Sequence, residues 1–225
     1  MKEFKTVNML ISGVGGQGVL HMAQIIASAA HRSGFDVFSA EVRGMSQGSG
    51  SLFTAVRYGS RVCSPVFGEG EGDILIALEL LEAVRYADYL KPDATVLANL
   101  QKIVPVIESL KCAPYPRHAE FYLRKRTRNA FLVPALEIAL ELGDARLAHI
   151  VMLGVLSTLL EFPRKAWLKA MSELLSPDNR EGRHTAFDKG IDWLQQTHPG
   201  AQNEHIDSAM RISHARALPP NRIFA

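Results

Sequence analysis

The sequence predicts an α/β fold with a mostly parallel, mixed sheet, and three stretches of the chain carry that prediction. An apolar strand at Val7–Ser12 runs into a glycine-rich turn at 13–18, and a helical pattern follows. Leu52–Tyr58 alternates as a strand does, and a Gly-Ser pair then predicts a returning strand at Arg61–Phe67. A buried strand at Asp73–Leu78 leads directly into another helix. Strand–turn–helix–strand units build parallel sheets, whereas a hairpin is antiparallel, so the sheet should be mixed.

Length and composition fit one α/β domain, or one domain with an appendage. Of the 225 residues, 47% are hydrophobic, which is enough for a sizeable core. The 25 basic and 23 acidic side chains nearly cancel, which disfavours a dedicated nucleic-acid-binding protein. Two cysteines are too few for a disulfide framework or an iron–sulfur cluster, and they indicate a reducing, cytoplasmic location. We expect neither a signal peptide nor a membrane span, because the apolar runs are too short for either.

The N-terminal half predicts alternating helices and strands. Apolar side chains recur at helical spacing over Val19–Arg32, and Gly34 ends that helix. Asp36–Glu41 is the second predicted strand. A strong helix is expected at Leu78–Leu90, followed by a turn and a further strand at Ala94–Asn99.

The C-terminal half predicts helices throughout. Two apolar helices are expected at Leu132–Leu142 and Leu147–Leu160, and two amphipathic ones at Pro163–Leu175 and His184–Leu194. The basic run Arg124–Arg128 is interpreted as a solvated face, with an acidic partner or a phosphate tail as the alternative.

The glycine-rich turn matches the GxGxxG pattern of a Rossmann-like, dinucleotide-binding start. Glycines allow a sharp turn, and the amides at the start of the following helix face whatever anion lies there. Glu41 stands about 20 residues further on, roughly where a dinucleotide site has its ribose-binding acid. A turn of this kind also serves for tight packing of strand on helix, so the pattern alone leaves nucleotide binding open.

Other motifs carry less chemistry. Gly44–Gly48 matches the GxSxG nucleophile elbow, but a strand follows instead of the required helix, which disfavours a serine hydrolase. The eight histidines include no HxH or HxxxH pair, which disfavours a metal site. A Walker GK[ST] ending and the GDG…N signature of thiamine enzymes are both absent from the sequence.

Three segments together resemble a known family. They read GVGGQGVL (13–20), AEVRGMSQGSGSLFTAVRYG (40–59) and DILIALELLEAVRYADYLKPDATVLAN (73–99). This combination is similar to the gamma-type subunits of 2-oxoacid:ferredoxin oxidoreductases, and most of all to the beta subunit of the indolepyruvate enzymes. The resemblance implies a three-layer α/β/α sandwich with C-terminal helices and a gamma-type domain over 1–194. Residues 195–225 lie outside the resemblance, and their polar, loosely patterned sequence predicts a C-terminal tail or arm that is partly disordered.

The resemblance also implies a function and partners. Enzymes of this family oxidise a 2-oxoacid with coenzyme A to an acyl-CoA and carbon dioxide, and they reduce ferredoxin. Thiamine diphosphate, Mg²⁺ and iron–sulfur clusters would lie in a larger alpha-type partner subunit, and this chain would bind no cofactor of its own. It would be a non-cofactor subunit of a homo- or hetero-oligomer, with an arylpyruvate such as indolepyruvate as the oxoacid and with CoA as a further candidate ligand.

The expected site joins the glycine turn to the loop that ends the second strand, at the carboxyl ends of the strands, where open α/β sheets bind ligands. We assign no catalytic acid, base or nucleophile and no metal ligand there. Ligand or partner binding is expected at Gly13, Gly15, Gly16, Gln17, Gly18, Glu41, Arg43, Gly44, Met45, Gln47 and Gly50.

One departure from the family pattern falls in this loop. The family commonly reads EVHGMAQRGG, so that Gly48 stands where an arginine is expected and Arg43 stands where a histidine is usual. A guanidinium binds carboxylate or phosphate through two parallel hydrogen bonds. Arg43 is the candidate to supply that charge from a nearby position.

Two alternatives remain open from the sequence. The chain can be a self-sufficient NAD(P)- or flavin-dependent oxidoreductase that uses the glycine turn. It can also be a stand-alone module that binds CoA or another anion.

Overall fold

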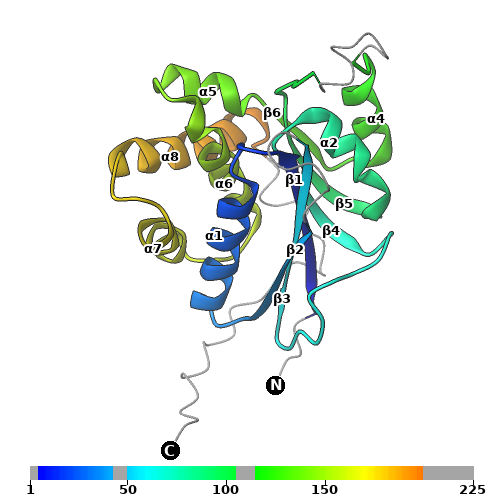
Figure 1. The fold of residues 1–225 in the computed structure, drawn as a ribbon, viewed down its shortest axis with the longest axis horizontal. Coiled ribbons are helices and arrows are strands. Elements are labelled where there is room, and N and C mark those ends of the chain that lie inside the picture. Colours follow the sequence, from blue (N-terminus) through cyan, green and yellow to red (C-terminus); the bar gives the residue numbers. More distant parts are fainter. Residues whose placement is uncertain (1–4, 43–49, 105–114, 200–225) are drawn as a thin grey trace, which may run out of the picture.

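The computed structural model describes residues 5–42, 50–104 and 115–199, and a six-stranded sheet forms its middle layer (Figure 1). The strand order is β2-β3-β1-β4-β5-β6. Among the described strands, β3 alone runs against the others, because it pairs antiparallel with both β1 and β2. The strands are β1 Val7–Val14, β2 Asp36–Val42, β3 Ser51–Gly59, β4 Gly72–Ala77, β5 Leu90–Asn99 and β6 Ala130–Val133.

Helices cover both faces of the sheet, which makes three layers (Figure 1). Helices α1, α5, α6, α7 and α8 lie on one face, and α2 and α4 lie on the other. The mixed α/β fold expected from the sequence is confirmed. The helices are α1 Val19–Arg32, α2 Leu80–Arg85, α4 Ala119–Arg126, α5 Ala135–Glu141, α6 Ala148–Leu159, α7 Arg164–Leu174 and α8 Arg180–Thr197, with short 3₁₀ turns η1 Ala87–Tyr89 and η2 Ala145–Leu147.

Successive side chains of the central strands point to opposite faces of the sheet, so they contribute to two hydrophobic cores. In β1, Met9 and Ile11 pack toward α1 and α6, whereas Leu10 packs toward α2 and α4. All three side chains are almost fully buried. Strands buried on both faces read as continuous apolar runs, which is why β1 and β4 are recognisable in the sequence.

Two glycines let α6 and α8 approach each other closely. A Cβ added to Gly154 of α6 would lie 2.0 Å from the carbonyl oxygen of Phe187, and one added to Gly190 of α8 would lie 2.1 Å from that of Val151. Helix α6 is apolar on nearly all sides and is buried between α8 and the sheet. This contact fixes the C-terminal helices against the core.

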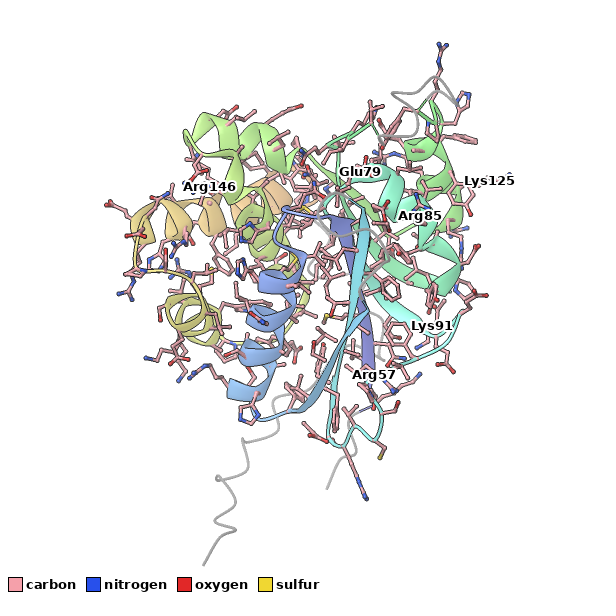
Figure 2. The ribbon with its side chains drawn as sticks, in the orientation of Figure 1. Arg57, Glu79, Arg85, Lys91, Lys125 and Arg146 are labelled. Carbon is pink, nitrogen blue, oxygen red and sulfur yellow. The ribbon has the colours of Figure 1, made fainter. Side chains whose placement is uncertain are left out.

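The hairpin predicted after Leu52–Tyr58 is wrong: Arg61–Phe67 forms no strand. Strand β3 already pairs with β1 on one edge and β2 on the other, so it has no free edge for a third partner. Side chains satisfy the backbone of the segment instead. Arg57 of β3, labelled in Figure 2, donates to the carbonyl oxygens of Ser64 and Val66 at 2.8 Å each.

Other element boundaries shift from the predicted ones. The helix expected at Leu78–Leu90 is shorter and ends in η1, so β5 begins at Leu90. The predicted helix at Leu132–Leu142 begins late, because its first residues belong to β6 and Pro134 separates the two elements. The basic run ends α4 and is only in part a solvated face. Arg124 and Lys125 are exposed, and Figure 2 labels Lys125. Arg126 instead donates to the Leu90 carbonyl oxygen, and Thr127 is buried.

We predict that Gly154→Ala lowers the free energy of unfolding by about 3 kcal/mol, because the new methyl group would overlap the backbone of α8. Urea unfolding followed by circular dichroism measures the change. Gly68→Ala is the matched control, since its Cβ would meet no atom closer than 3.8 Å, and it should stay within about 0.5 kcal/mol of wild type. Equal stability of the two variants would contradict the close α6–α8 contact.

Candidate functional site

The glycine turn lies at the carboxyl edge of the sheet. Strands β1, β4, β5 and β6 are parallel, so their carboxyl ends share that edge, and β3 begins there. Gly16 and Gly18 both have φ of +90°, a conformation that side chains with a Cβ rarely adopt. The Gly15 amide donates to the Gly50 carbonyl oxygen at 3.2 Å. The turn therefore lies beside the end of the Glu41–Gly50 loop, as the sequence analysis expects.

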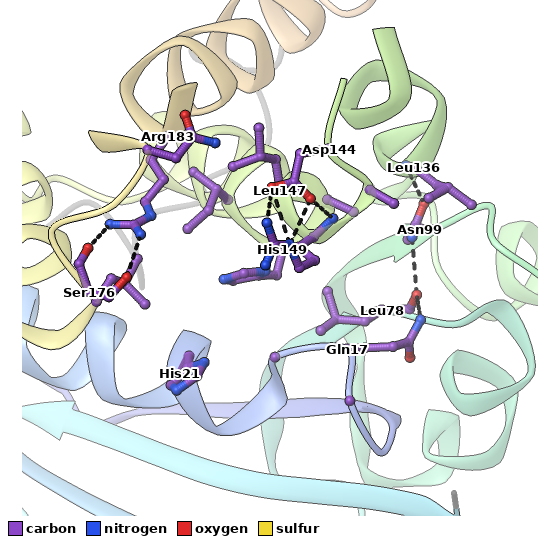
Figure 3. Close-up of a pocket in the computed structure, with 18 of the residues that line it drawn as sticks. Gln17, His21, Leu78, Asn99, Leu136, Asp144, Leu147, His149, Ser176 and Arg183 are labelled. Atoms are coloured by element: carbon purple, nitrogen blue, oxygen red, sulfur yellow. Dashed lines mark hydrogen bonds and ion pairs between the residues drawn. The ribbon is translucent and has the colours of Figure 1, made fainter. Parts of the chain in front are cut away.

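Gln17 ties the turn to the neighbouring strands (Figure 3). Its Oε1 accepts a hydrogen bond from the Val14 amide at 2.7 Å, which closes the turn. Its Nε2 donates to the Leu78 carbonyl oxygen just after β4 and to Oε1 of Gln101 just after β5, each at 2.9 Å. Asn99 joins the same network, because its Nδ2 donates to the Leu78 carbonyl oxygen at 3.1 Å. Both polar atoms of the Gln17 side chain thus bind the scaffold.

The structure describes only some of the other residues predicted to form the site. The backbone of Glu41 lies in β2, and Arg43, Gly44, Met45 and Gln47 lie outside the described residues. Their expected role in binding stays a prediction.

The strand order disfavours a dinucleotide site at the turn. Glu41 pairs with Thr54 of β3, and β3 separates β2 from β1. Neighbouring strands lie about 4.8 Å apart, so the end of β2 is about 10 Å from β1. In a dinucleotide-binding fold the second strand lies directly beside the first, and its acid reaches the ribose. Here the strand that carries the acid is one place further out.

A pocket of about 680 Å³ opens beside the turn (Figure 3). Its walls come from the glycine turn and α1, from the carboxyl edge around Asn99 and Gln101, and from the starts of α6 and α8. This volume lies within the range of sites for small organic ligands. The residues that α6 and α8 contribute were not among those predicted from the sequence. The cationic or imidazole side chains in its wall are His21, Arg146, His149 and Arg183.

His149 is the most perturbed titratable group in this wall. A Cβ added to Gly18 would lie 3.0 Å from its Cγ and 3.1 Å from its Nδ1, so the imidazole rests on the turn. Burial is the main cause that lowers the pKa of His149 from 6.5 to about 4. A backbone hydrogen bond with Arg146 opposes this effect, and the nearby His21 and Arg183 add to it. The imidazole is therefore neutral at pH 7.

Comparison with known proteins identifies the family. The family model described as pyruvate ferredoxin/flavodoxin oxidoreductase matches residues 8–193. The chain belongs to this family. A curated relative, "Indolepyruvate oxidoreductase subunit IorB" of Pyrococcus horikoshii, is 35% identical over 196 residues, which are 85% of this chain and 96% of the relative.

Solved structures share the fold of this oxidoreductase-family chain. The gamma subunit of a keto/oxoacid ferredoxin oxidoreductase from Geobacter sulfurreducens superimposes with a TM-score of 0.62 at 20% identity, over 84% of this chain and 95% of that one. A 2-oxoglutarate:ferredoxin oxidoreductase from Magnetococcus marinus, with 2-oxoglutarate, coenzyme A and succinyl-CoA bound, gives 0.68 at 20% identity, over 85% of this chain. This chain spans 31% of the Magnetococcus chain.

Two buried carboxylates stabilise the carboxyl edge of the sheet, on the face that α2 covers. Glu79, labelled in Figure 2, accepts hydrogen bonds from the Tyr115 hydroxyl at 2.6 Å and from the Ile103 amide at 3.1 Å. Glu82 accepts from the hydroxyl of Ser51, the first residue of β3. The exposed fractions of Glu79 and Glu82 are 1% and 4%, so these bonds compensate the cost of burying the two groups. Glu79 holds a backbone amide and a side chain at the edge, and Glu82 holds the side chain of Ser51. Sequence reasoning missed both acids.

The described residues add two further observations. They contain no cluster of three or more His, Cys, Asp or Glu side chains that could hold a metal ion. In the same ranges no helix is long and apolar enough to cross a membrane.

We predict that Gln17→Glu lowers the free energy of unfolding by about 2 kcal/mol at pH 7. The carboxylate would face two acceptor oxygens, of Leu78 and Gln101, to which the amide now donates. Gln24→Glu, the same change at an exposed position of α1, is the control and should stay within about 0.5 kcal/mol of wild type. Chemical denaturation measures both, and equal effects would contradict the bridging role of Gln17.

We predict a loss of stability in mild acid that depends on His149. Its folded pKa of about 4 lies below the ordinary 6.5, so the unfolded chain binds the extra proton first as the pH falls. The stability that depends on neutral His149 is fully present above pH 6.5. It is lost as the pH falls toward 4, and the free energy of unfolding is about 2 kcal/mol lower at pH 5. Urea unfolding at pH 7 and pH 5 measures it. His149→Gln should reduce the difference by about that amount, whereas exposed His31→Gln should preserve it; identical pH dependence in all three proteins would contradict the prediction.

Proposed function

We propose that the chain is the non-cofactor subunit of a 2-oxoacid:ferredoxin oxidoreductase of the indolepyruvate, or arylpyruvate, type. The observation that carries this proposal is the match to an indolepyruvate oxidoreductase subunit over 96% of that relative's length. The complex would oxidise the oxoacid and CoA to an acyl-CoA, carbon dioxide and a proton, and it would pass two electrons to ferredoxin.

The electron chemistry of this reaction would belong to a larger alpha-type subunit. Thiamine diphosphate with Mg²⁺ supports the decarboxylation, and iron–sulfur clusters carry the electrons. The two cysteines of this chain cannot supply the roughly four thiolates that one cluster needs. We therefore place these cofactors, and the docking of ferredoxin, on the partner, in a cytoplasmic hetero-oligomer.

This chain would contribute its carboxyl edge. The glycine turn and Gly50 meet there, and Gln17, Glu79 and Glu82 hold the edge rigidly. Rigid, precisely shaped elements are suited to position a neighbouring subunit or the CoA substrate. The NAD(P)- or flavin-dependent alternative is less well supported, because the Gln17 side chain is committed to the scaffold and Glu41 lies on a strand that is not adjacent to β1.

The experiment that tests this function is affinity purification of the chain from its native cells. The proposal expects a larger partner that contains thiamine diphosphate and iron–sulfur clusters, and oxoacid- and CoA-dependent reduction of ferredoxin that is lost when this chain is removed and regained when it is added back. Tight NAD(H) binding and dehydrogenase activity in the isolated chain, without a partner, would overturn the proposal in favour of the alternative.

We predict that Arg43→Ala raises the KM for the oxoacid or for CoA about tenfold in the assembled complex, because a bidentate charged contact is lost. Gly48→Arg in the same background restores the guanidinium at the position where the family has it, and should recover part of the loss. Steady-state kinetics measure both, and gel filtration checks assembly. Unchanged turnover and unchanged apparent affinities in Arg43→Ala would contradict the role of Arg43.

A further inference from the structure

The outer side of α4 is strongly basic. The helix and the residues that flank it carry four exposed cationic side chains, Arg117, Arg124, Lys125 and Arg128. Figure 2 labels Lys125 on the side of α4 that points away from the sheet. In the ranges that the structure describes, none of the four forms an ion pair with a carboxylate. Glu120 is the only acid of the sequence between Tyr115 and Ala130, and it is already bound to Lys102 at 3.4 Å.

Two aromatic side chains lie exposed on the same helix. Among the large hydrophobic side chains of the described residues, Phe121 is the most exposed, at 67%, and the neighbouring Tyr122 is 41% exposed. Leu123 fills the inward position and belongs to the core on the α2 side. Helical spacing places Phe121 on one stripe with Arg124 and Lys125, three and four residues further along. The outer face of α4 thus combines apolar rings with unpaired positive charge.

Both ends of α4 are tied to the sheet, so this face has a fixed shape. Just before the helix, the Tyr115 hydroxyl donates to Glu79 at the carboxyl edge, at 2.6 Å. In the last turn, Arg126 donates to the carbonyl oxygen of Leu90, where β5 begins. The first contact places the basic, aromatic face directly beside the carboxyl edge that we propose for the partner subunit. A surface that is ordered beforehand loses less conformational entropy when it binds.

We propose that the outer face of α4 docks an acidic surface of the larger partner subunit, with Arg124 and Lys125 paired to its carboxylates and with Phe121 and Tyr122 against apolar side chains. Interfaces between proteins are complementary in charge, and their anchors are commonly aromatic and arginine side chains. The nearly balanced charge of the whole chain disfavours a nucleic acid as the ligand of this face. The identity of the partner rests on the proposed function, and the chemistry of its surface follows from α4.

The test measures the affinity of the chain for the partner subunit after the purified complex has been separated and recombined. Arg124→Glu combined with Lys125→Glu should weaken the association at least about tenfold, because both charges would then repel the acidic surface. Raising the salt concentration from about 50 mM to about 300 mM should weaken the association of the wild type, because salt screens attraction between charges. Phe121→Ser should cost about tenfold at either salt concentration, since the contact that it removes is apolar.

A matched control separates this face from general electrostatic attraction. Lys165→Glu combined with Lys189→Glu reverses two exposed charges on α7 and α8, which lie on the other face of the sheet (Figure 1). Its affinity for the partner subunit should equal that of the wild type, and circular dichroism verifies that every variant is folded. Equal losses in the two double variants, or unchanged affinity in the α4 variants, would overturn the inference and leave the proposed function intact.

A second measurement does not need the partner subunit. The probes are a peptide of Glu residues interspersed with Leu, its uncharged counterpart with Gln in place of Glu, and single-stranded DNA, each titrated into the full-length chain and followed by amide NMR. We expect the acidic peptide to shift the signals of α4, and Arg124→Glu with Lys125→Glu to abolish that shift. No shift at α4, or tighter binding of the DNA there, would overturn the inference. If no partner co-purifies with the chain, the proposed function fails, and this titration alone decides whether α4 docks an acidic protein surface.

Discussion

The side-chain amide of Gln17 is the interaction on which the candidate site depends. One carboxamide closes the glycine turn at Val14 and reaches two further strand ends through Leu78 and Gln101. A primary amide is suited to this position because it offers one acceptor and two donors in a fixed plane. Gln17 stands within the GxGxxG pattern, and its hydrogen bonds connect the carboxyl ends of β1, β4 and β5.

Backbone conformation and packing account for the glycines of the turn, although the strand order is not that of a dinucleotide site. Gly16 and Gly18 are required by the backbone conformation, and the ring of His149 packs directly on Gly18. On the opposite face, Glu79 accepts from the Ile103 amide and the Tyr115 hydroxyl, and Glu82 accepts from the Ser51 hydroxyl. The carboxyl edge is thus held from both helical layers, which suits a surface that must keep its shape against a partner subunit.

The pocket lies at the same edge. Arg183 and His149 stand in its wall, while α6 and α8 pack closely at Gly154 and Gly190. A shift of α8 relative to α6 would move Asn179 and Arg183 away from the turn. The packing of the C-terminal helices therefore sets the dimensions of the pocket, even though their sequences carry no recognisable binding motif.

Elements governed by local patterns could be predicted from the sequence, and those governed by distant contacts could not. The first strand, α1 and β2 follow from apolar periodicity and glycine placement. The false strand at Arg61–Phe67 arose because the pairing of β3 with β1 and β2 is decided by distant residues. The family could be recognised from three segments, but the Gln17–Gln101 contact joins residues 84 positions apart and leaves no local trace. His149 was visible only as a polar residue opening an otherwise apolar helix.

The central claim is that the carboxyl edge of this chain faces its partner in an oxidoreductase complex. Amide hydrogen exchange of the chain, alone and in the purified complex, tests it most directly. The account predicts that protection increases on assembly at residues 15–18 and 50–51, while the opposite end of the sheet, around Gly59 and Gly72, stays unchanged. Protection confined to that opposite end, with the glycine turn exchanging as in the isolated chain, would contradict the claim.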